Sequence, residues 1–458
     1  MKLRKWQAEC VERALQHYRS QTHFLCQATP GAGKSVMAAE LATRLYQTDK
    51  IDFILCFSPS VTIASGLART FSDRFDLPFD GKLGAIGGAY TYQSMPHQDE
   101  EFWSLLDRYK VFVVFDEIHH CAGSDLGNAN KWGAEILAKI QHRAAYTLTL
   151  TGTPWRSDMR PIVLSPYGNN GITCDYTYGL QRAVAEGVCR KPNIVLIDNE
   201  KLVIHDTGNT QEFSGIEALL TGSNTAYRSI LRNHNALKHC LKLGIEKLQQ
   251  LRSKNAMAAG LVVASSVAHA KDIVALLRDA FGLSASLVTY QESNPQRIIE
   301  TFRHSNQPWI VSVGMISEGT DIPRLQVCCH LSNVTTELYF RQVLGRGIRV
   351  TPDCDGETWL YTFAEPKITE YANRIAEDLP EHQVIFHCAE EKQPKEKPSV
   401  PRSISEIAPL DYVDVGLISH HSEPNTCPAT KTADSLEILP TLEFLGSFRN
   451  KLCGLILA

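Results

Sequence analysis

Short, unbroken apolar runs alternate with helix-like stretches along the first 155 residues. FILCF at 53–57, VFVVF at 111–115 and YTLTL at 146–150 are rich in aromatic and β-branched residues. Continuous runs of this kind are typical of strands that are buried on both faces, whereas half-exposed strands alternate apolar and polar residues. The pattern therefore predicts a parallel sheet that is flanked by helices.

The same pattern restarts after about residue 255. Strand-like runs recur as LVVAS at 261–265, WIVSV at 309–313, VCCHL at 327–331 and TWLYTF at 358–363, with helix-like stretches between them. Two separate groups of runs predict two α/β domains in tandem.

The expected domain boundaries follow from these groups and from changes in composition. The first domain is predicted at residues 1–195, a connecting segment at 196–250 and the second domain at 251–385. Residues 386–458 are predicted to form a short C-terminal extension, a linker and tail of unknown role, because 390–402 (EEKQPKEKPSVPR) is charged and rich in proline. Three roles stay open for its apolar end: packing on the second domain, binding a protein partner, or no fixed structure.

Composition and charge narrow the choice only a little. The chain has 46 basic and 50 acidic residues, a net charge of −4, so any nucleic-acid binding would need a local basic groove. It has no apolar run of 18 residues and no signal-type segment after MKLRKWQAEC, so neither a membrane location nor export is expected. The 13 cysteines lack Cys-x-x-Cys spacing, which fits reduced thiols in a cytoplasmic protein.

A glycine-rich segment, ATPGAGKS at 28–35, lies between a strand-like run and a helix-like stretch. In this context small residues let backbone N–H groups close around a phosphate, and the start of the following helix faces the anion. Lys34 would reach the β- and γ-phosphates of a nucleotide, and Ser35 would hold Mg²⁺. The alternative is a solvated turn without a ligand. The remaining residues of the predicted phosphate cradle are Thr29, Pro30, Gly31, Ala32 and Gly33.

Two adjacent carboxylates end the run VFVVFDEIHH at 111–120. Asp116 at the end of a buried strand can hold Mg²⁺, and Glu117 is then placed to orient and deprotonate an attacking water. His119 could couple this site to the second domain. Taken alone, the pair could be a surface turn, but about 80 residues after a phosphate loop it indicates a nucleotide hydrolase.

With both elements present, the chain resembles superfamily 2 helicases of the DEAH type. It looks closest to the branch that holds the restriction-enzyme helicase subunits and bacterial repair helicases of the RadD type, with motifs in family order over about residues 3–365. The resemblance implies two RecA-like domains, ATP and Mg²⁺ as cofactors, and a nucleic acid as partner, with DNA favoured over RNA.

The resemblance also implies roles for residues in the first domain. LRKWQ at 3–7 matches the adenine-recognising element, so Gln7 would bond the adenine edge, with Arg4 or Trp6 against the ring. TGTPWR at 151–156 matches motif III, in which the Thr151 and Thr153 hydroxyls could relay the state of the γ-phosphate. Hydroxyls in two further motif-like segments could bond nucleic-acid phosphates without reading bases: Ser58, Ser60 and Thr91.

In the second domain two segments match the family. VSVGMISEGTDIP at 311–323 resembles motif V, whose Gly319 and Asp321 would face the nucleotide and the strand. YFRQVLGRGIR at 339–349 resembles motif VI, whose Gln342, Arg346 and Arg349 would share one face of a helix. Both arginines would offset charge on the γ-phosphate in the transition state. The alternative is a basic helix face exposed to water.

These motifs together predict an ATP-driven helicase or translocase that hydrolyses ATP between its two domains. DNA is the favoured substrate, and repair, restriction or phage defence are the expected settings. Two alternatives stay open. One is a nucleic-acid-stimulated ATPase that serves as a switch or scaffold subunit without strand separation. The other is a P-loop kinase, which would share the phosphate loop but would not need motif VI.

Overall fold

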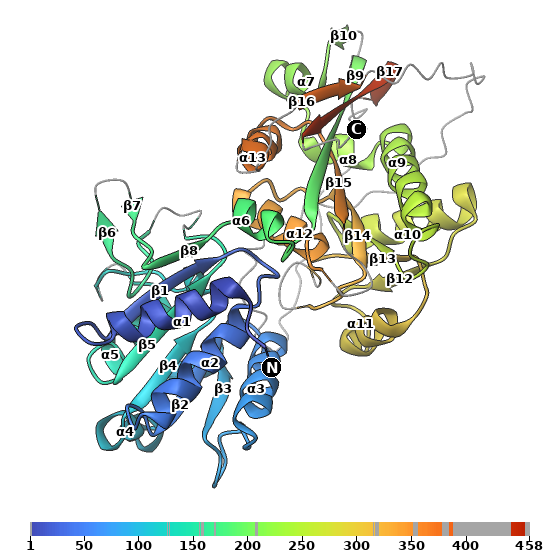
Figure 1. Cartoon of the computed structure of the whole chain (residues 1–458). Coiled ribbons are helices and arrows are strands. Elements are labelled where there is room, and N and C mark those ends of the chain that lie inside the picture. Colours follow the sequence, from blue (N-terminus) through green and yellow to red (C-terminus); the bar gives the residue numbers. More distant parts are fainter. Residues whose placement is uncertain are drawn as a thin grey trace, which may run out of the picture.

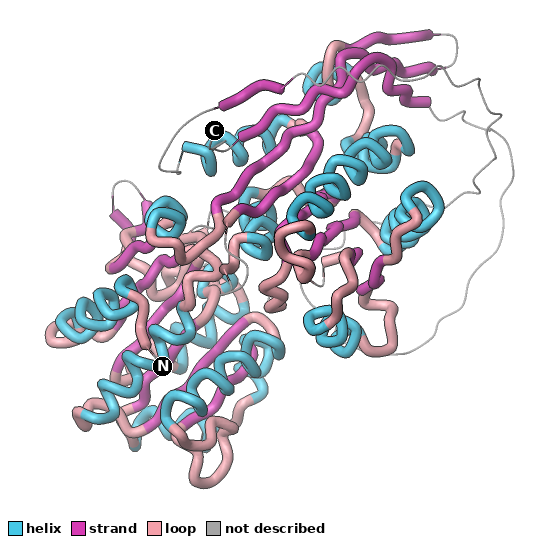
Figure 2. Tube along the Cα trace, turned by 45° about the vertical axis from the view of Figure 1, so that its right-hand side comes forward, coloured by secondary structure: helices cyan, strands magenta, loops and turns pink. Residues whose placement is uncertain are grey.

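The computed structural model describes residues 2–125, 127, 129–154, 156, 160–168, 171–206, 209–314, 316, 320–350, 356–377, 384–387 and 441–453. The chain forms two lobes, each built around its own sheet (Figures 1 and 2). Within the described part of the chain, no helix has both the length and the apolar character needed to cross a membrane.

The first lobe contains six parallel strands in the order β3-β2-β4-β5-β1-β8. Every residue of β4 is buried, which explains why its sequence is an unbroken apolar run. The parallel sheet predicted for this half is therefore confirmed. The strands are β1 (His23–Ala28), β2 (Phe53–Ser58), β3 (Gly87–Thr91), β4 (Val111–Phe115), β5 (Tyr146–Thr151) and β8 (Tyr176–Tyr178); the short strands β6 (Tyr167–Gly168) and β7 (Gly171–Ile172) pair apart from the sheet.

Helices cover both faces of this sheet. On one face α1, α2 and α3 lie side by side and bury apolar residues such as Met37 and Phe71 (Figure 1). On the other face a second core contains Trp103 of α4 and Ile136 of α5. The helices are α1 (Lys5–His17), α2 (Lys34–Gln47), α3 (Val61–Phe75), α4 (Glu100–Arg108), α5 (Lys131–Lys139) and α6 (Leu180–Ala185), with short 3₁₀ turns η1 (Tyr92–His97) and η2 (Ile118–His120).

The second lobe contains a larger sheet in the order β12-β13-β11-β14-β15-β9-β17-β16, with β10 paired to β9. Pairing is parallel from β12 to β9 and antiparallel for β10, β16 and β17. The strands are β9 (Lys191–Asp206), β10 (Asn209–Phe213), β11 (Ala259–Ala264), β12 (Ala285–Val288), β13 (Trp309–Ser312), β14 (Leu325–Leu331), β15 (Glu357–Phe363), β16 (Val384–His387) and β17 (Thr441–Cys453). The helices are α7 (Ile216–Gly222), α8 (Tyr227–Arg232), α9 (His234–Arg252), α10 (Val267–Phe281), α11 (Pro295–His304), α12 (Glu337–Gly347) and α13 (Pro366–Glu377).

The change from the first lobe to the second comes earlier than the predicted boundary at residue 195. That position lies inside β9, which pairs with β15 in the register Ile194↔Leu360. The segment 196–250, predicted as a connection, supplies the rest of β9 and helix α9, which packs on β14 and β15. The sequence concealed this because the apolar half of β9 follows directly on the first lobe and its polar half resembles a loop.

Residues 441–453 of the apolar end of the chain pack on the second lobe, which was one of the three roles left open. β17 runs antiparallel to β9 along most of its length. Phe444, Phe448 and Leu452 are buried, and the Phe448 ring stacks on His239 with centroids 4.1 Å apart. The predicted linker at 390–402 lies outside the described residues.

Candidate active site

The phosphate loop connects β1 to α2, as its sequence predicts. Gly31 and Gly33 have φ angles of 79° and 93°, a left-handed backbone that residues with a Cβ rarely adopt. Gly33 is the N-cap of α2, so free N–H groups at the start of this helix point toward the loop. Lys34 is the first residue of the helix, and its buried Nζ donates to Ala28 O at 3.2 Å.

The two carboxylates follow β4 and meet this lysine. Glu117 has φ 51°, a left-handed conformation that costs about 1–3 kcal/mol in a residue other than glycine. The turn brings Glu117 Oε1 to 3.3 Å from Lys34 Nζ, and Glu117 Oε2 accepts from the N–H of Gly152 at 3.3 Å. The strained backbone at Glu117 therefore accompanies a side chain that is directed at Lys34 next to the phosphate loop.

Burial acts on both carboxyl groups, but their neighbours differ. Burial and then the charge of Glu117 raise the pKa of Asp116 to about 7. Burial also disfavours ionised Glu117, but Lys34 and then His119 outweigh it and lower the pKa of Glu117 to about 2. A buried carboxyl with a raised pKa is the group that a divalent cation would stabilise in its ionised form, and the Ser35 hydroxyl lines the same cavity. Asp116 and Ser35 therefore fit Mg²⁺.

His119 connects the carboxylate turn to motif III. Its Nδ1 lies 3.0 Å from Thr151 Oγ1 and 3.4 Å from Glu117 Oε2. The Thr151 hydroxyl in turn donates to Thr153 O at 2.8 Å, so the predicted relay residues lie together. Trp155 of this motif lies outside the described residues.

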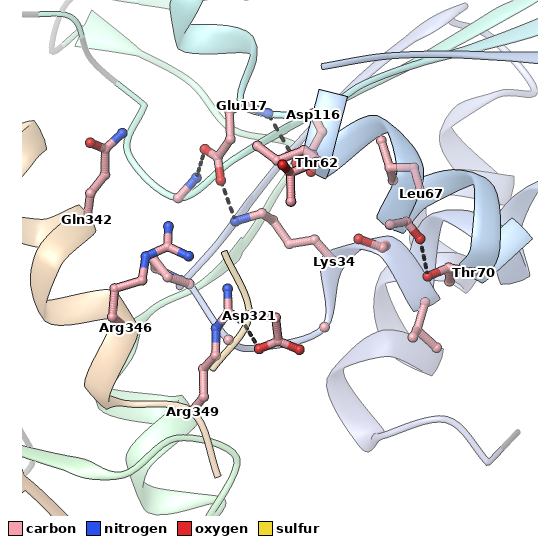
Figure 3. Close-up of a pocket in the computed structure, with 18 of the residues that line it drawn as sticks. Lys34, Thr62, Leu67, Thr70, Asp116, Glu117, Asp321, Gln342, Arg346 and Arg349 are labelled. Atoms are coloured by element: carbon pink, nitrogen blue, oxygen red, sulfur yellow. Dashed lines mark hydrogen bonds and ion pairs between the residues drawn. The ribbon is translucent and has the colours of Figure 1, made fainter. Parts of the chain in front are cut away.

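Motif VI faces this site from the second lobe. Gln342 and Arg346 lie on α12, but this helix ends at Gly347, so the prediction that Arg349 shares its helical face is wrong. Gly345 and Gly347 are poor helix formers, and Arg349 instead forms an isolated bridge with Cys189. All three side chains nevertheless line one cavity of about 440 Å³ with Lys34, Ser35, Asp116 and Glu117 (Figure 3).

The contact between motif VI and the phosphate loop is close. A Cβ on Gly31 would lie 3.0 Å from Arg349 Cγ, and one on Gly345 would lie 2.9 Å from Pro30 Cβ. Arg346 Nη1 donates to Thr320 O at 2.7 Å, and Arg349 pairs with Asp321, which also lines the cavity. Asp321 is thus at the site, whereas Gly319 lies outside the described residues.

This contact makes Gly345 a sensitive position. In Gly345→Ala the added methyl would push motif VI away from Pro30, so we expect ATP turnover to fall about tenfold or more with ATP still bound. Turnover and nucleotide affinity measure the effect. Gly244→Ala is the matched control, because its methyl would meet Cys329 Sγ at 2.7 Å inside the second lobe and should cost stability alone. Equal losses of turnover in both variants would contradict the expectation.

The predicted adenine element, residues 3–7, forms hydrogen bonds to backbone carbonyls of the phosphate loop. Trp6 is fully buried, stacks on Tyr178 at 4.7 Å and donates to Ala32 O at 3.2 Å, so its predicted place against an adenine ring is wrong. Arg4 donates to Ala32 O at 2.7 Å, and Gln7 donates to Gly33 O at 2.9 Å. The adenine contact of Gln7 stays a prediction.

The hydroxyls predicted to hold nucleic-acid phosphates are partly engaged elsewhere. Ser58 is fully buried and donates to Ser60 O at 3.2 Å, so it cannot reach a phosphate. Ser60 Oγ accepts from Ile63 N and caps α3. One face of α3 also lines the cavity, through Thr62, Gly66 and Thr70, and these residues were not predicted from the sequence. Their i, i+4, i+8 spacing was the available signal.

Comparisons with known proteins agree with this arrangement of motifs. Residues 1–156 match the family described as the res subunit of type III restriction enzymes, and residues 243–351 match the helicase conserved C-terminal domain. The chain therefore carries a domain that matches the type III restriction-enzyme res subunit, followed by a domain that matches the helicase C-terminal family. The first match ends at motif III and the second ends after motif VI, so the two family domains correspond to the two sides of the cavity.

Solved structures of restriction enzymes resemble this chain in its fold of two RecA-like domains. A fragment of an HsdR subunit of a type I restriction enzyme from Vibrio vulnificus YJ016 has a TM-score of 0.55 at 17% identity, over 81% of this chain and 65% of that one. The ATP-dependent type ISP restriction-modification enzyme LlaBIII, bound to DNA, has a TM-score of 0.51 at 15% identity, over 79% and 27%. At these identities the likeness concerns the fold alone.

Curated relatives extend beyond the matched region. An uncharacterized protein of Mycobacterium leprae is 28% identical over 364 residues, 76% of this chain and 59% of that protein. One from Mycobacterium tuberculosis strain H37Rv is 29% identical over 366 residues, with the same coverage. The chain thus spans about 59% of the length of these relatives.

Proposed function

We propose that this protein is an ATP-dependent translocase or helicase that acts on nucleic acid and hydrolyses ATP in the cleft between its lobes. One observation carries the proposal. A single cavity is lined by Lys34, Asp116 and Glu117 of the first lobe and by Arg346 and Arg349 of the second. A nucleotide in this cavity would have ligands from both lobes, so its binding and hydrolysis would change how the lobes sit against each other.

Each residue has a proposed role that follows from its chemistry. The loop 29–33 and Lys34 bind the β- and γ-phosphates, and Glu117 orients a water and accepts its proton. Asp116 and Ser35 would hold Mg²⁺, which supplies charge neutralisation on the phosphate oxygens when bound. Arg346 and Arg349 place positive charge against the γ-phosphate from the opposite side.

Release of Glu117 from Lys34 would make hydrolysis depend on ATP. Lys34 Nζ and Glu117 Oε1 form an ion pair at 3.3 Å. A γ-phosphate that takes the lysine would leave the carboxylate free to bond water. The contact of Glu117 with His119, and through it with Thr151, then provides a route by which the phosphate state could reach motif III.

DNA is the proposed substrate over RNA. A restriction-modification enzyme with the same fold has been solved on DNA, and the family match names restriction enzymes. A nucleic-acid-stimulated ATPase without strand separation is the second candidate, because the residues that line the cavity account for hydrolysis but not for strand separation. A P-loop kinase would not need motif VI, so the position of Gln342, Arg346 and Arg349 in the cavity argues against the kinase alternative.

A panel of nucleic acids tests the proposal. ATP turnover would be measured without nucleic acid and with single-stranded, duplex and forked DNA and RNA. We expect stimulation by DNA that weakens steeply with salt, because contacts would be mainly to phosphates. Displacement of a labelled strand from the fork separates a helicase from a translocase or switch. Turnover that no nucleic acid changes would contradict the proposed function.

A further inference from the structure

Arg190 is a buried charged side chain at the point where the chain passes between the lobes. It lies between α6 and β9, and only 1% of its surface is exposed. Its guanidinium donates to three backbone carbonyls: Leu325 O at 2.8 Å, Gly347 O at 2.9 Å and Pro323 O at 3.0 Å. A planar fork of fixed N–H directions can hold three such acceptors in one arrangement, which a single ammonium group cannot.

The acceptors belong to the two segments that bring the second lobe to the cavity. Pro323 follows Asp321 by two residues, and both line the cavity. Gly347 ends the helix that carries Arg346, where the last carbonyls of a helix lack partners within it. Arg190 therefore joins the motif V loop to the end of motif VI.

The backbone of the segment between α6 and β9, here called the inter-lobe linker, adds further contacts to this junction. The N–H of Arg190 donates to Ile348 O at 2.7 Å, and Cys189 forms a β-bridge with Arg349. On its other side, Cys189 Sγ lies 3.6 Å from Pro30 O of the phosphate loop. Cys189 thus lies between the phosphate loop and motif VI, and Arg190 next to it is bonded to the motif VI side.

We propose that Arg190 is a positioning residue for hydrolysis, which fixes the Asp321 loop and the Arg346–Arg349 segment to the linker as one unit. A change in the angle between the lobes would then move both arginines and Asp321 together. This inference rests on the proposed function, because the position of the arginines matters for turnover only if they act on the nucleotide.

A second buried arginine provides a matched control. Arg324 is 7% exposed and also donates to backbone carbonyls, at 2.7 Å to Gln307 O, 2.8 Å to Phe302 O and 3.1 Å to Met257 O. None of these three residues lines the cavity. Arg190→Lys and Arg324→Lys in the full chain therefore make the same chemical change, but only the first alters a donor to the end of motif VI, Gly347 O.

Steady-state kinetics and thermal unfolding form the first part of the test. We expect both variants to unfold at lower temperature than the parent. Arg190→Lys should lower kcat by about 10- to 100-fold with ATP affinity changed about threefold or less, because misplaced groups slow the chemical step more than binding. Arg324→Lys should keep the parent kcat. A parent-like kcat in Arg190→Lys, or an equal loss in both variants, would overturn the inference.

Two further measurements separate this inference from the proposed function. In an Arg346→Ala background, Arg190→Lys should lower kcat further by no more than about twofold, because residues that act as a unit are not additive; multiplied losses would overturn the inference. Hydrogen exchange needs no turnover. Amides of residues 345–350 should exchange faster in Arg190→Lys than in Arg324→Lys, and equal exchange there would refute the junction whether or not the chain hydrolyses ATP.

Discussion

Replacing Glu117 by glutamine is expected to stop ATP hydrolysis while ATP still binds. The amide keeps the size of the carboxyl group but cannot take a proton from water, a role worth about 10²- to 10⁴-fold in rate. Binding should be equal or tighter, because the change removes a negative charge that lies 3.3 Å from the lysine proposed to hold the γ-phosphate. Turnover and equilibrium binding of ATP, measured on the same preparation, check both parts.

Lys34→Ala supplies the contrast to this variant. It removes the positive charge from the loop and leaves Glu117 without its ion-pair partner, so both ATP binding and hydrolysis should be lost. The two variants therefore separate binding from chemistry. Hydrolysis by Glu117→Gln within about tenfold of the parent would remove Glu117 from the proposed mechanism.

The second large effect is expected from Arg346→Ala. If this guanidinium neutralises charge that develops on the γ-phosphate, its loss should lower kcat by about 10³-fold, the lower end of the range for arginine fingers. ATP affinity should change far less, because the charge is largest in the transition state. Single-turnover hydrolysis with pre-bound ATP measures the chemical step directly.

Arg374→Ala is a suitable control for this experiment. Arg374 lies on α13 of the same lobe, its side chain is 51% exposed, and it pairs with Glu337 and Glu370. Exposed pairs contribute little to stability, so this variant should keep the parent rate. Normal turnover in Arg346→Ala would remove this arginine from the proposed reaction.

Local chemistry made much of the site predictable from the sequence. The residues of the phosphate loop, the carboxylate pair and motif VI lie close together in the sequence, and their roles suit few other residue types. Gly31 and Gly33, for example, adopt a left-handed backbone that favours glycine. Buried parallel strands were equally predictable, because strands buried on both faces, such as β4 and β11, contain few polar residues.

What the sequence concealed depends on contacts between distant segments. The sequence allowed Trp6 to stack on an adenine ring, but in the structure this residue is buried and stacks on Tyr178 instead. The role of β9 depends on its pairing with both β15 and β17, which lie about 160 and 250 residues further along the chain. Arg190 carries no local signal, since its three acceptors come from two other segments.

A structure of the Glu117→Gln chain with ATP and Mg²⁺ would test the central claim most directly, because it traps the nucleotide before hydrolysis. The account predicts Lys34 on one side of the γ-phosphate and the guanidinium groups of Arg346 and Arg349 on the other, each at about 3 Å from a phosphate oxygen. ATP held by the first lobe alone, with both arginines turned away from it, would contradict the account.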